Sequence, residues 1–419
     1  MQRRITVNLG NLILSLSDAM DLADSSLILH QQRTALIVWE MGKAAGFKED
    51  KLERIFIGAL LHDIGAFSLE EKISLRNFEV GNVEDHCIRG EALLAQIPWL
   101  RNSAGIIRFH HKPWQDFAES IEDTVVFESQ LLCIADYVER KIDRDRYILH
   151  QYEGIIQKIK SRAGTMFHPE IVELFLTISL REEFWLDLAS PRLYSLLLNE
   201  GPFRKIEINF PDISAISELF RNIIDFRSRF TSTHSSGVAA SASMLSKVFG
   251  LTETEIGLME VAGNLHDLGK LAIPNSILNK PGQLTKEEML IMKSHTYYTY
   301  AVINTIGGLQ QIAEWAAYHH EKLDGSGYPF HCNAEELNTG ARIMMVADIF
   351  TALTEDRPYR KGMSKDSVIK ILQQFSKRKL LDTRIIDLLF DNYQEISSHV
   401  SEKQADTRDF YEKQFAFLQ

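Results

Sequence analysis

The sequence predicts an all-α protein built from two helical bundles in tandem, and three observations support this prediction. Apolar residues recur at intervals of three and four along most of the chain, which is the spacing of amphipathic helices. Segments that alternate apolar and polar residues are few. A set of histidines and aspartates occurs twice in the same order, as two copies of one domain would give. The 419 residues suit about two or three domains.

The expected elements can be placed in chain order. The helical spacing is clearest at residues 32–47, 49–67, 252–270 and 364–375. Thr252 and Thr285 each precede acidic residues, as in the capped first turn of a helix. The best strand candidate is residues 204–210, which glycine and proline residues flank. This punctuation divides the chain into an N-terminal domain, residues 1–200, and a C-terminal domain, residues 201–419.

Composition limits the classes of function. The net charge of −11 is a poor match to a protein that binds long nucleic acids or anionic membranes, since such proteins need a basic surface. A small anionic substrate remains compatible with a local positive pocket. The first 24 residues carry two arginines and an apolar run that aspartates interrupt, so we expect an opening helix or strand rather than a membrane span. Three scattered cysteines fit a reducing cytoplasm, the expected location.

Ten of the 14 histidines belong to the duplicated pattern. The first set is His30, His62, Asp63, His86, His110, His111 and Asp136, and the second is His234, His266, Asp267, His295, His319, His320 and Asp348. The first and second histidines are 32 residues apart in each set, and the third and fourth are 24 apart. The sequences ALLHDIG and NLHDLG around the second histidine also correspond. The pattern indicates an internal duplication with a period of about 204 residues, the interval from His30 to His234.

These side chains have the chemistry of a metal site. Neutral imidazoles and carboxylates are ligands that divalent transition metals prefer, and an adjacent His-Asp pair can place a carboxylate between two ions. Seven ligands exceed the four of a tetrahedral zinc site, so two metals are the simpler interpretation. A dinuclear centre of this kind activates water and stabilises charge on a phosphoryl group.

With these residues in view, the pattern resembles the HD superfamily of metal-dependent phosphohydrolases. The second copy adds HDLGKLAIPNSILNKPGQLT, HHEKLDGSGYPF and ADIFTALTEDRPYRKGMS, which resemble the motifs of HD-GYP phosphodiesterases for cyclic dinucleotides. The resemblance is close over residues 205–400, and the HD pattern extends loosely over residues 25–140. The paired arrangement is most similar to Vibrio-type phosphodiesterases for cyclic GMP-AMP. The fold class that this resemblance implies is two HD-type bundles in tandem.

The resemblance implies roles for particular residues. His234, His266, Asp267 and Asp348 would hold one metal, and Asp267, His295, His319 and His320 the other, with Asp267 as the bridge. The two ions per site would be iron or manganese. The catalytic residues would be Asp267 and Lys270, with Lys270 also binding the scissile phosphate; the other substrate contacts would be Arg357, Arg360 and the loop of Gly327, Tyr328 and Pro329. The same loop is a candidate surface for a signalling-protein partner.

Several positions depart from the family pattern. Phe230 stands where a glutamate often supports a third metal, which favours a dinuclear centre, and Gly237 replaces a usual arginine. The first copy keeps all seven ligand types, but it has Ala66 where the second has Lys270, and it lacks the GYP loop.

We therefore expect the C-terminal domain to hydrolyse a cyclic dinucleotide, cyclic GMP-AMP or cyclic di-GMP, to a linear dinucleotide. The alternative is a receptor that binds a cyclic dinucleotide without cleaving it and signals to a partner protein. A ribonuclease of the same superfamily is disfavoured by the acidic charge and the GYP loop. For the N-terminal domain two interpretations stay open: a 5′-nucleotidase with its own metal site, or a structural or sensory module.

Overall fold

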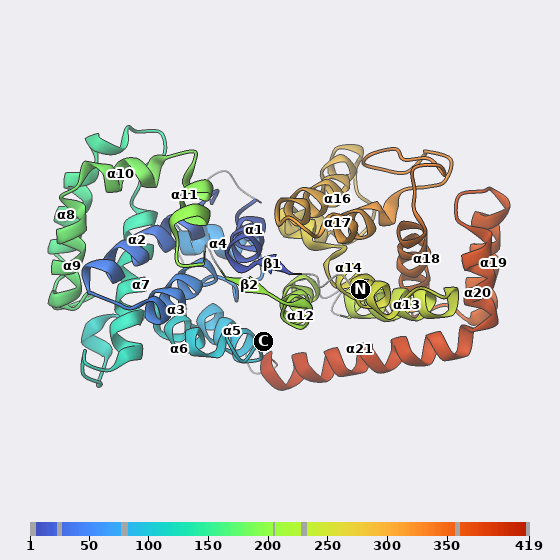
Figure 1. Ribbon diagram of the computed structural model, residues 1–419, viewed down its shortest axis with the longest axis horizontal. Coiled ribbons are helices and arrows are strands. Elements are labelled where there is room, and N and C mark those ends of the chain that lie inside the picture. The colour runs from blue at the N-terminus through green and yellow to red at the C-terminus, as the bar shows by residue number, and fades with distance from the viewer. Residues whose placement is uncertain are drawn as a thin grey trace. The chain divides into compact units, whose positions relative to one another are not determined.

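The computed structural model describes residues 6–22, 27–76, 83–203, 206–227, 233–356 and 361–415. The chain separates into two compact units (Figure 1). In the described chain, the N-terminal unit lies within residues 7–208, and the C-terminal unit within residues 209–415 together with Thr6. The described chain is helical apart from one short pair of strands and isolated bridges, so the predicted all-α fold is confirmed.

The N-terminal unit begins with a two-residue strand and continues through a series of helices. Its elements are β1 (Val7–Asn8), α1 (Leu9–Asp21), α2 (His30–Ala44), α3 (Glu49–Leu60), α4 (Leu69–Arg76), α5 (Glu84–Leu94), α6 (Arg101–Phe109), the 3₁₀ turn η1 (Trp114–Asp116), α7 (Thr124–Arg140), η2 (Ile148–His150), α8 (Tyr152–Lys160), α9 (Pro169–Ser179), α10 (Glu182–Ala189), α11 (Leu193–Glu200) and β2 (Glu207–Ile208). Helix α2 packs against α3 and α7 in the centre of this unit.

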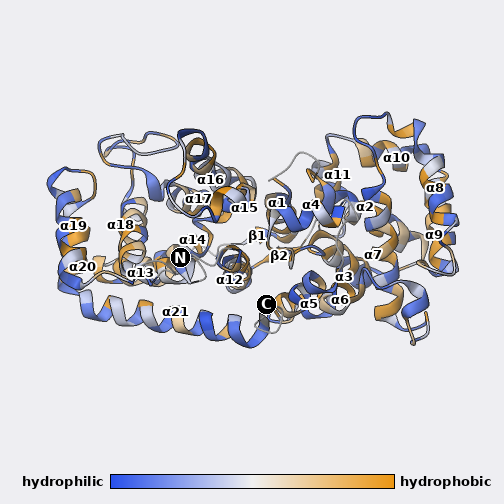
Figure 2. Ribbon diagram, turned by 180° about the vertical axis from the view of Figure 1, so that it is seen from behind, coloured by the Kyte–Doolittle hydropathy of each residue, from blue (hydrophilic) through white to orange (hydrophobic). Residues whose placement is uncertain are grey.

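In its described part, the C-terminal unit consists of helices, the loops that join them and one isolated bridge between Asp324 and Asn333. Its elements are α12 (Phe210–Phe226), α13 (His234–Phe249), α14 (Glu253–Leu265), η3 (Leu268–Ala272), α15 (Asn275–Leu278), α16 (Lys286–Thr305), α17 (Gln310–Ala317), η4 (Tyr318–His320), α18 (Thr339–Thr354), α19 (Lys365–Lys377), α20 (Thr383–Asp391) and α21 (Tyr393–Phe415). Helix α13 packs against α14, α18 and α21. Many of these helices carry both hydrophilic and hydrophobic residues along their length, as amphipathic helices do (Figure 2).

The helix starts follow from local sequence. Thr252 and Thr285 form the predicted capping boxes, in which the threonine hydroxyl accepts the N–H of the third helical residue and that glutamate accepts the N–H of the threonine. Such a box satisfies two backbone donors that the first turn leaves without helical partners. Both α14 and α16, which begin in this way, lead to residues of the histidine cluster.

The only two strands among the described residues show that the duplication extends further back than the histidines. Val7 pairs with Ile208 and Asn8 with Glu207 in an antiparallel ladder. Asn8 then caps α1 and Asn209 caps α12, each by accepting the N–H of the residue three positions on. The predicted strand at 204–210 is thus present, though only as Glu207–Ile208 in its described part.

Two helices end earlier than their apolar spacing predicted. Helix α3 ends at Leu60 and α14 at Leu265, so that each His-Asp pair lies just beyond a helix rather than inside it. The turns bring Gly65 and Gly269 against the next ligand-bearing helix. A Cβ atom at Gly65 would lie 2.0 Å from the carbonyl oxygen of His86, and one at Gly269 would lie 1.9 Å from that of His295. Glycine allows this approach because it has no Cβ.

Two further findings concern membrane spans and disulfides. Among the described residues, no helix has both the length and the apolar character needed to cross a bilayer. The three cysteines, all in described segments, form no disulfide.

Candidate metal centres

The seven candidate ligands of the C-terminal unit come from separate helical segments and meet in one cluster. His234 begins α13, His266 and Asp267 follow α14, His295 lies in α16, His319 and His320 end η4, and Asp348 lies in α18. All are buried except His320, whose side chain is 31% exposed. The fold thus brings together every ligand that the sequence singled out in this unit.

Two aspartates face the histidines, one from the turn after α14 and the other from α18. Oδ2 of Asp267 lies 3.1 Å from Nε2 of His266, and its Oδ1 lies 3.4 Å from Nε2 of His295. Oδ1 of Asp348 lies 3.1 Å from Nε2 of His234, and its Oδ2 lies 3.6 Å from Nδ1 of His320. The two oxygens of each carboxylate therefore face different histidines, as a ligand placed between two ions would require.

Ligand atoms gather into overlapping groups in which all atoms lie within 4.8 Å of one another. The groups are His234, His266 and Asp348; His266, Asp267 and His319; and His295, His319 and His320. The first and last groups fall within the two ligand sets that the resemblance implied. The middle group shares His266 with the first group and His319 with the last.

Five of the ten rings in the two clusters are oriented by the backbone that precedes them. In the C-terminal unit, Nδ1 lies 2.8 Å from the carbonyl oxygen three residues earlier in His266, and 2.6 Å in His295 and in His319. His62 and His110 make the same contact in the N-terminal unit, at 2.8 and 2.6 Å. A carbonyl oxygen only accepts, so Nδ1 carries the proton and Nε2 presents a lone pair.

These lone pairs fit a cation. Nε2 of His295 and Nε2 of His319 lie 3.3 Å apart, and neither can donate to the other in this tautomer. Nε2 of His266 is buried and meets no hydrogen-bond partner among the described residues. Burial lowers the pKa of His295 to about 4, so this ring is neutral at pH 7. A divalent ion would satisfy these nitrogens, and the residues present therefore fit a metal.

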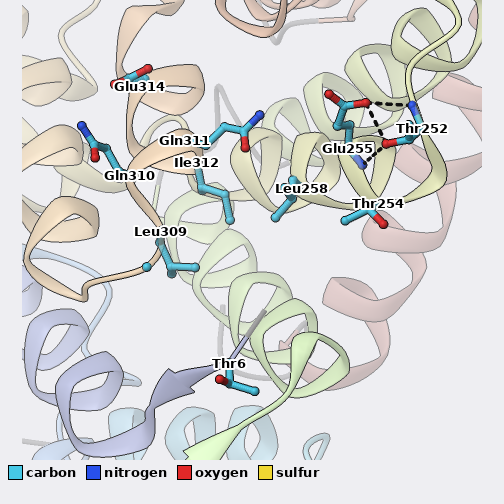
Figure 3. A pocket seen from close by; sticks show the side chains of 11 residues that line it. Thr6, Thr252, Thr254, Glu255, Leu258, Leu309, Gln310, Gln311, Ile312 and Glu314 are labelled. Atoms are coloured by element: carbon cyan, nitrogen blue, oxygen red, sulfur yellow. Dashed lines mark hydrogen bonds between the residues drawn. The ribbon is translucent and has the colours of Figure 1, made fainter. Parts of the chain in front are cut away.

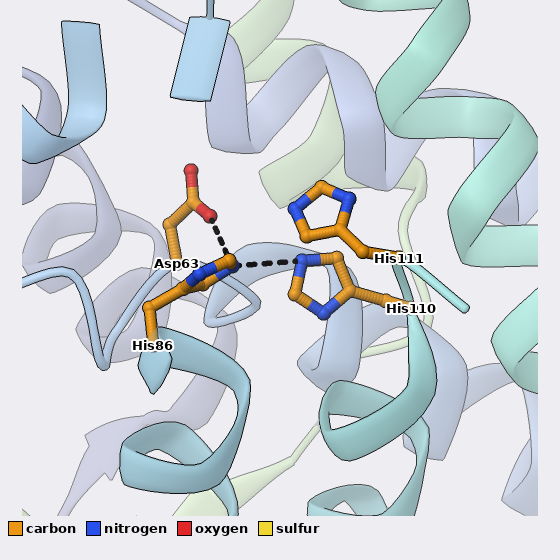
Figure 4. Close-up of side chains that lie close together, drawn as sticks. All are labelled: Asp63, His86, His110 and His111. Carbon is orange, nitrogen blue, oxygen red and sulfur yellow. Dashed lines mark hydrogen bonds and ion pairs between the residues drawn. The ribbon is translucent and has the colours of Figure 1, made fainter. Parts of the chain in front are cut away.

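The N-terminal unit assembles its own seven ligand candidates in the same order. His30 begins α2, His62 and Asp63 follow α3, His86 lies in α5, His110 and His111 follow α6, and Asp136 lies in α7. Figure 4 shows Asp63, His86, His110 and His111 turned toward one another, and their ligand atoms lie within 4.8 Å. Nε2 of His86 lies 3.4 Å from Nε2 of His110 and 3.6 Å from Oδ1 of Asp63. Burial lowers the pKa of His86 to about 3 and of His110 to about 4.

The two clusters differ in the cation that touches them. In the C-terminal unit, Nζ of Lys270 lies 2.5 Å from Oδ2 of Asp267. In the N-terminal unit Ala66 takes the place of the lysine, and Nη2 of Arg140 lies 2.6 Å from Oδ2 of Asp136 instead. Lys270 keeps 17% of its side chain exposed, whereas Arg140 keeps 6% and also donates to the carbonyl of Leu75. Lys270 is therefore the better placed of the two to meet a substrate.

The GYP loop lies next to the C-terminal cluster. The ring of Tyr328 lies 5.0 Å from that of His320, and Nζ of Lys293 lies 5.0 Å from the centre of the Tyr328 ring. Gly327 passes so close to the backbone of Glu321 that a Cβ atom there would lie 2.3 Å from the Glu321 Cα. The peptide bond between Tyr328 and Pro329 is cis. The loop thus borders the site, as the motif predicted.

Glu321 is a residue of this loop whose part the sequence did not reveal. Its side chain is buried, and its two carboxylate oxygens accept the N–H groups of Phe330 at 2.8 Å and Cys332 at 3.1 Å. The carboxylate therefore closes the loop onto the segment that carries His319 and His320. Its position directly after the two histidines was a signal that could have been used.

A second pair of missed residues repeats at the same interval as the histidines. Asp21 is buried and accepts the N–H of Gln31 at 3.1 Å, and Asp225 is buried and accepts that of Ser235 at 3.0 Å. Each carboxylate thus caps the helix that begins with the first histidine of its unit. The interval from Asp21 to Asp225 is 204 residues, the same as between His30 and His234.

Three of the residues singled out from sequence cannot be placed. Arg357, Arg360 and Phe230 lie outside the described residues. Gly237 is described, and a Cβ atom there would lie 2.7 Å from the side chains of both Gln404 and Thr351. The packing of α13 against these residues of α18 and α21 leaves little room for a side chain at this position.

A cavity of about 900 Å³ lies away from the cluster of the C-terminal unit. Figure 3 shows its lining, which includes Thr252 and Glu255 at the start of α14 and Gln310 and Glu314 in α17. None of the predicted ligands lines it. The lining residues of α14 belong to the first part of that helix, whereas His266 follows its last residue.

Comparison with known proteins finds two HD domains in this chain and relatives that are cyclic dinucleotide phosphodiesterases. Residues 218–385 and residues 27–141 each match a family described as HD domain. The chain is 29% identical over 401 residues to the 3′3′-cGAMP-specific phosphodiesterase 1 of Vibrio cholerae, covering 93% of both chains. It is 30% identical over 246 residues to a cyclic di-GMP phosphodiesterase of Thermotoga maritima, covering 57% of this chain and 67% of the relative.

A solved structure shares the fold. The crystal structure of a cyclic GMP-AMP-specific phosphodiesterase of Vibrio cholerae matches with a TM-score of 0.65, at 22% sequence identity. The match covers 93% of this chain and 98% of that one. Both units of the present chain therefore fall within the compared region.

Metal binding should stabilise the folded protein. Chelator-treated protein should melt at a lower temperature than protein supplied with Mn²⁺, because an ion that binds only the folded chain adds about 2.7 kcal/mol at 100 times its Kd. Differential scanning calorimetry over a Mn²⁺ titration measures this effect. A variant with His62, Asp63, His266 and Asp267 all replaced by alanine is the control and should not respond. An unchanged melting temperature in wild type would contradict the metal assignment.

Proposed function

This chain belongs to the HD-GYP phosphodiesterase family, and from that premise we propose that its C-terminal unit is a metal-dependent enzyme that opens a cyclic dinucleotide to a linear one. The observation that carries the proposal is the convergence of seven ligand side chains in one cluster with a lysine at its edge. Cyclic GMP-AMP is our proposed preferred substrate, since the relative that matches across 93% of the chain is specific for it. A cytoplasmic location is proposed with it.

The proposed centre holds two divalent ions, iron or manganese. Asp267 would serve both ions, as the family resemblance implies, and its two oxygens face His266 and His295. When bound, the ions supply Lewis acidity toward a phosphoryl oxygen and lower the pKa of water to about 7. His234 and Asp348 would complete one half of the centre, and His295 and His320 the other.

The protein's own residues provide charge and orientation for the reaction. Lys270 is a cation at the edge of the cluster, and it would stabilise the negative charge that grows on the phosphoryl oxygens as water attacks. Tyr328 borders the cluster through its contact with His320 and offers an aromatic face to a base. Arg357 and Arg360 would hold the remaining phosphate and a base by bidentate hydrogen bonds.

For the N-terminal unit we propose a phosphomonoesterase that acts on the linear product. The supporting observation is the cluster of Asp63, His86, His110 and His111, which offers ligands without the GYP loop beside it. Opening a cyclic dinucleotide leaves a terminal phosphate, and a monoester of this kind suits a metal site that has no loop over it. The unit would then act as a 5′-nucleotidase on the product made by the C-terminal unit.

Removing the central ligands should abolish turnover. His266→Ala deletes a ligand and Asp267→Ala deletes the bridge, so each variant should lose more than about 100-fold in kcat, beyond the 10–100-fold typical of residues behind the ligands. Metal analysis should find about two ions in the C-terminal unit of wild type. His399→Ala, on α21 and outside the cluster, is the matched histidine control. Full activity of the His266→Ala, Asp267→Ala double variant would refute the assignment. Wild-type protein that binds a cyclic dinucleotide without hydrolysing it would instead be a receptor.

Substitutions of two cationic side chains should distinguish an effect on the chemical step from an effect on substrate binding. Lys270→Ala should lower kcat by about 10²–10³, because the ammonium meets charge that develops in the transition state. Arg357→Ala should mainly raise KM. Steady-state kinetics on cyclic GMP-AMP and cyclic di-GMP distinguish these effects, with Lys280→Ala as a control whose ammonium pairs with Glu288. If both variants behave like wild type, the phosphate contacts lie at other residues.

The N-terminal proposal predicts a second product. Wild type should open the cyclic dinucleotide and then release inorganic phosphate from the linear product. The His62→Ala, Asp63→Ala variant should still open the ring but release no phosphate. Chromatography of the nucleotides and a phosphate assay over time follow both steps. Absence of phosphate release in wild type would mean that the N-terminal unit has a structural or sensory role.

A further inference from the structure

The first histidine of each cluster is not among the five whose rings are oriented by a backbone carbonyl three residues earlier. His234 is the first residue of α13 and His30 is the first residue of α2. In both of these rings Nδ1 lies next to a carboxylate, not next to the backbone carbonyl that orients His266, His295 and His319.

In the C-terminal unit a buried glutamate occupies that place. Oε2 of Glu355 lies 3.3 Å from Nδ1 of His234, while Oδ1 of Asp348 lies 3.1 Å from Nε2 on the other side of the ring. Glu355 follows Asp348 by seven residues, two helical turns, so both carboxylates lie on the same face. The His234 ring is thus held between two carboxylates from one segment of chain.

Glu355 is itself fixed in position. Its side chain is 5% exposed, and its Oε1 accepts the hydroxyl hydrogen of Thr233 at 2.7 Å. The amide of Gln404, which lies in α21, donates to the same oxygen at 3.4 Å. These contacts leave Oε2 directed at the imidazole.

The N-terminal unit reaches the same arrangement from a different position. Oε2 of Glu139 lies 2.5 Å from Nδ1 of His30, and Glu139 is fully buried. Glu139 follows Asp136 by three residues, whereas the residue three after Asp348 is Thr351. The duplicated ligand sets therefore use glutamates that do not correspond in sequence. Because the glutamate comes from a different position in each copy, the contact was not simply inherited through the duplication. This indicates that the first histidine of each cluster needs a carboxylate next to Nδ1.

We propose that Glu355 is a positioning residue for the metal centre, whose carboxylate, 3.3 Å from Nδ1 of His234, keeps the Nε2 lone pair of that ring directed into the cluster. A carboxylate behind a ligating histidine fixes the tautomer and orientation of the ring and raises its basicity as a ligand. Glu139 does the same for His30 in the N-terminal unit. The inference rests on the proposed metal centre of the C-terminal unit.

The test is Mn²⁺ affinity of the full chain, measured by electron paramagnetic resonance. A His62→Ala, Asp63→Ala background removes the N-terminal ligands, so that the titration reports on the C-terminal unit. Glu355→Ala should weaken Mn²⁺ binding by about 10–100-fold, the usual effect of losing a group behind a metal-ligating histidine. Glu355→Gln keeps an acceptor oxygen for the Nδ1 proton and should recover part of this loss.

Two controls make the outcome decisive. Glu402→Gln, at a side chain that is 71% exposed on α21, should bind Mn²⁺ like the parent. The melting temperature of each metal-free variant shows whether the fold is kept. If Glu355→Ala binds Mn²⁺ as tightly as the parent, the inference is wrong. It is also wrong if Glu355→Ala and Glu355→Gln lose the same affinity and both melt at a lower temperature than the parent without metal. A parent that binds no Mn²⁺ would instead contradict the proposed function.

Discussion

The arrangement of both units depends on where the imidazole protons lie. In five of the cluster histidines the Nδ1 proton is given to the carbonyl three residues earlier, which directs the opposite nitrogen away from the helix and into a small buried space. Four of these five nitrogens lie 3.2 to 3.4 Å from the Nε2 atom of another cluster histidine, in the pairs His30–His62, His86–His110 and His295–His319. Burial of so many lone pairs costs free energy unless a cation satisfies them. The helices of each unit thus converge on a cluster of ligand atoms that a bound cation would satisfy.

Much of this could be read from the sequence because the ligands follow a pattern. Fourteen side chains of only two types, in the same order twice, are enough to identify the duplication from the amino-acid sequence alone. The all-α fold followed from apolar spacing, and the capped starts of α14 and α16 followed from Thr252 and Thr285. Spacing alone could not show that α3 and α14 end before their His-Asp pairs, since that depends on how closely the next helix approaches.

The residues behind the ligands were harder to foresee, for physical reasons. Glu321 follows the two histidines directly, but its role depends on backbone N–H groups that only the fold of the loop brings to it. Glu139 and Glu355 lie at different distances from their aspartates, so comparing the two copies does not reveal them. Asp21 and Asp225 do correspond, and extending the comparison toward the N-terminus would have found them.

The contact of Gly65 and Gly269 with the next helix has a consequence for how these units can diverge. At both places the separation of the second and third ligands is set by one backbone against another, not by the size of core side chains. Apolar residues around the cluster can therefore be exchanged for others of similar volume without moving the ligands. A single added methyl group at either glycine, however, would wedge the two helices apart. Each unit can therefore accept many substitutions in its apolar core but not a larger residue at this glycine. Such a substitution would disrupt the ligand cluster of that unit although all seven ligand residues remain in the sequence.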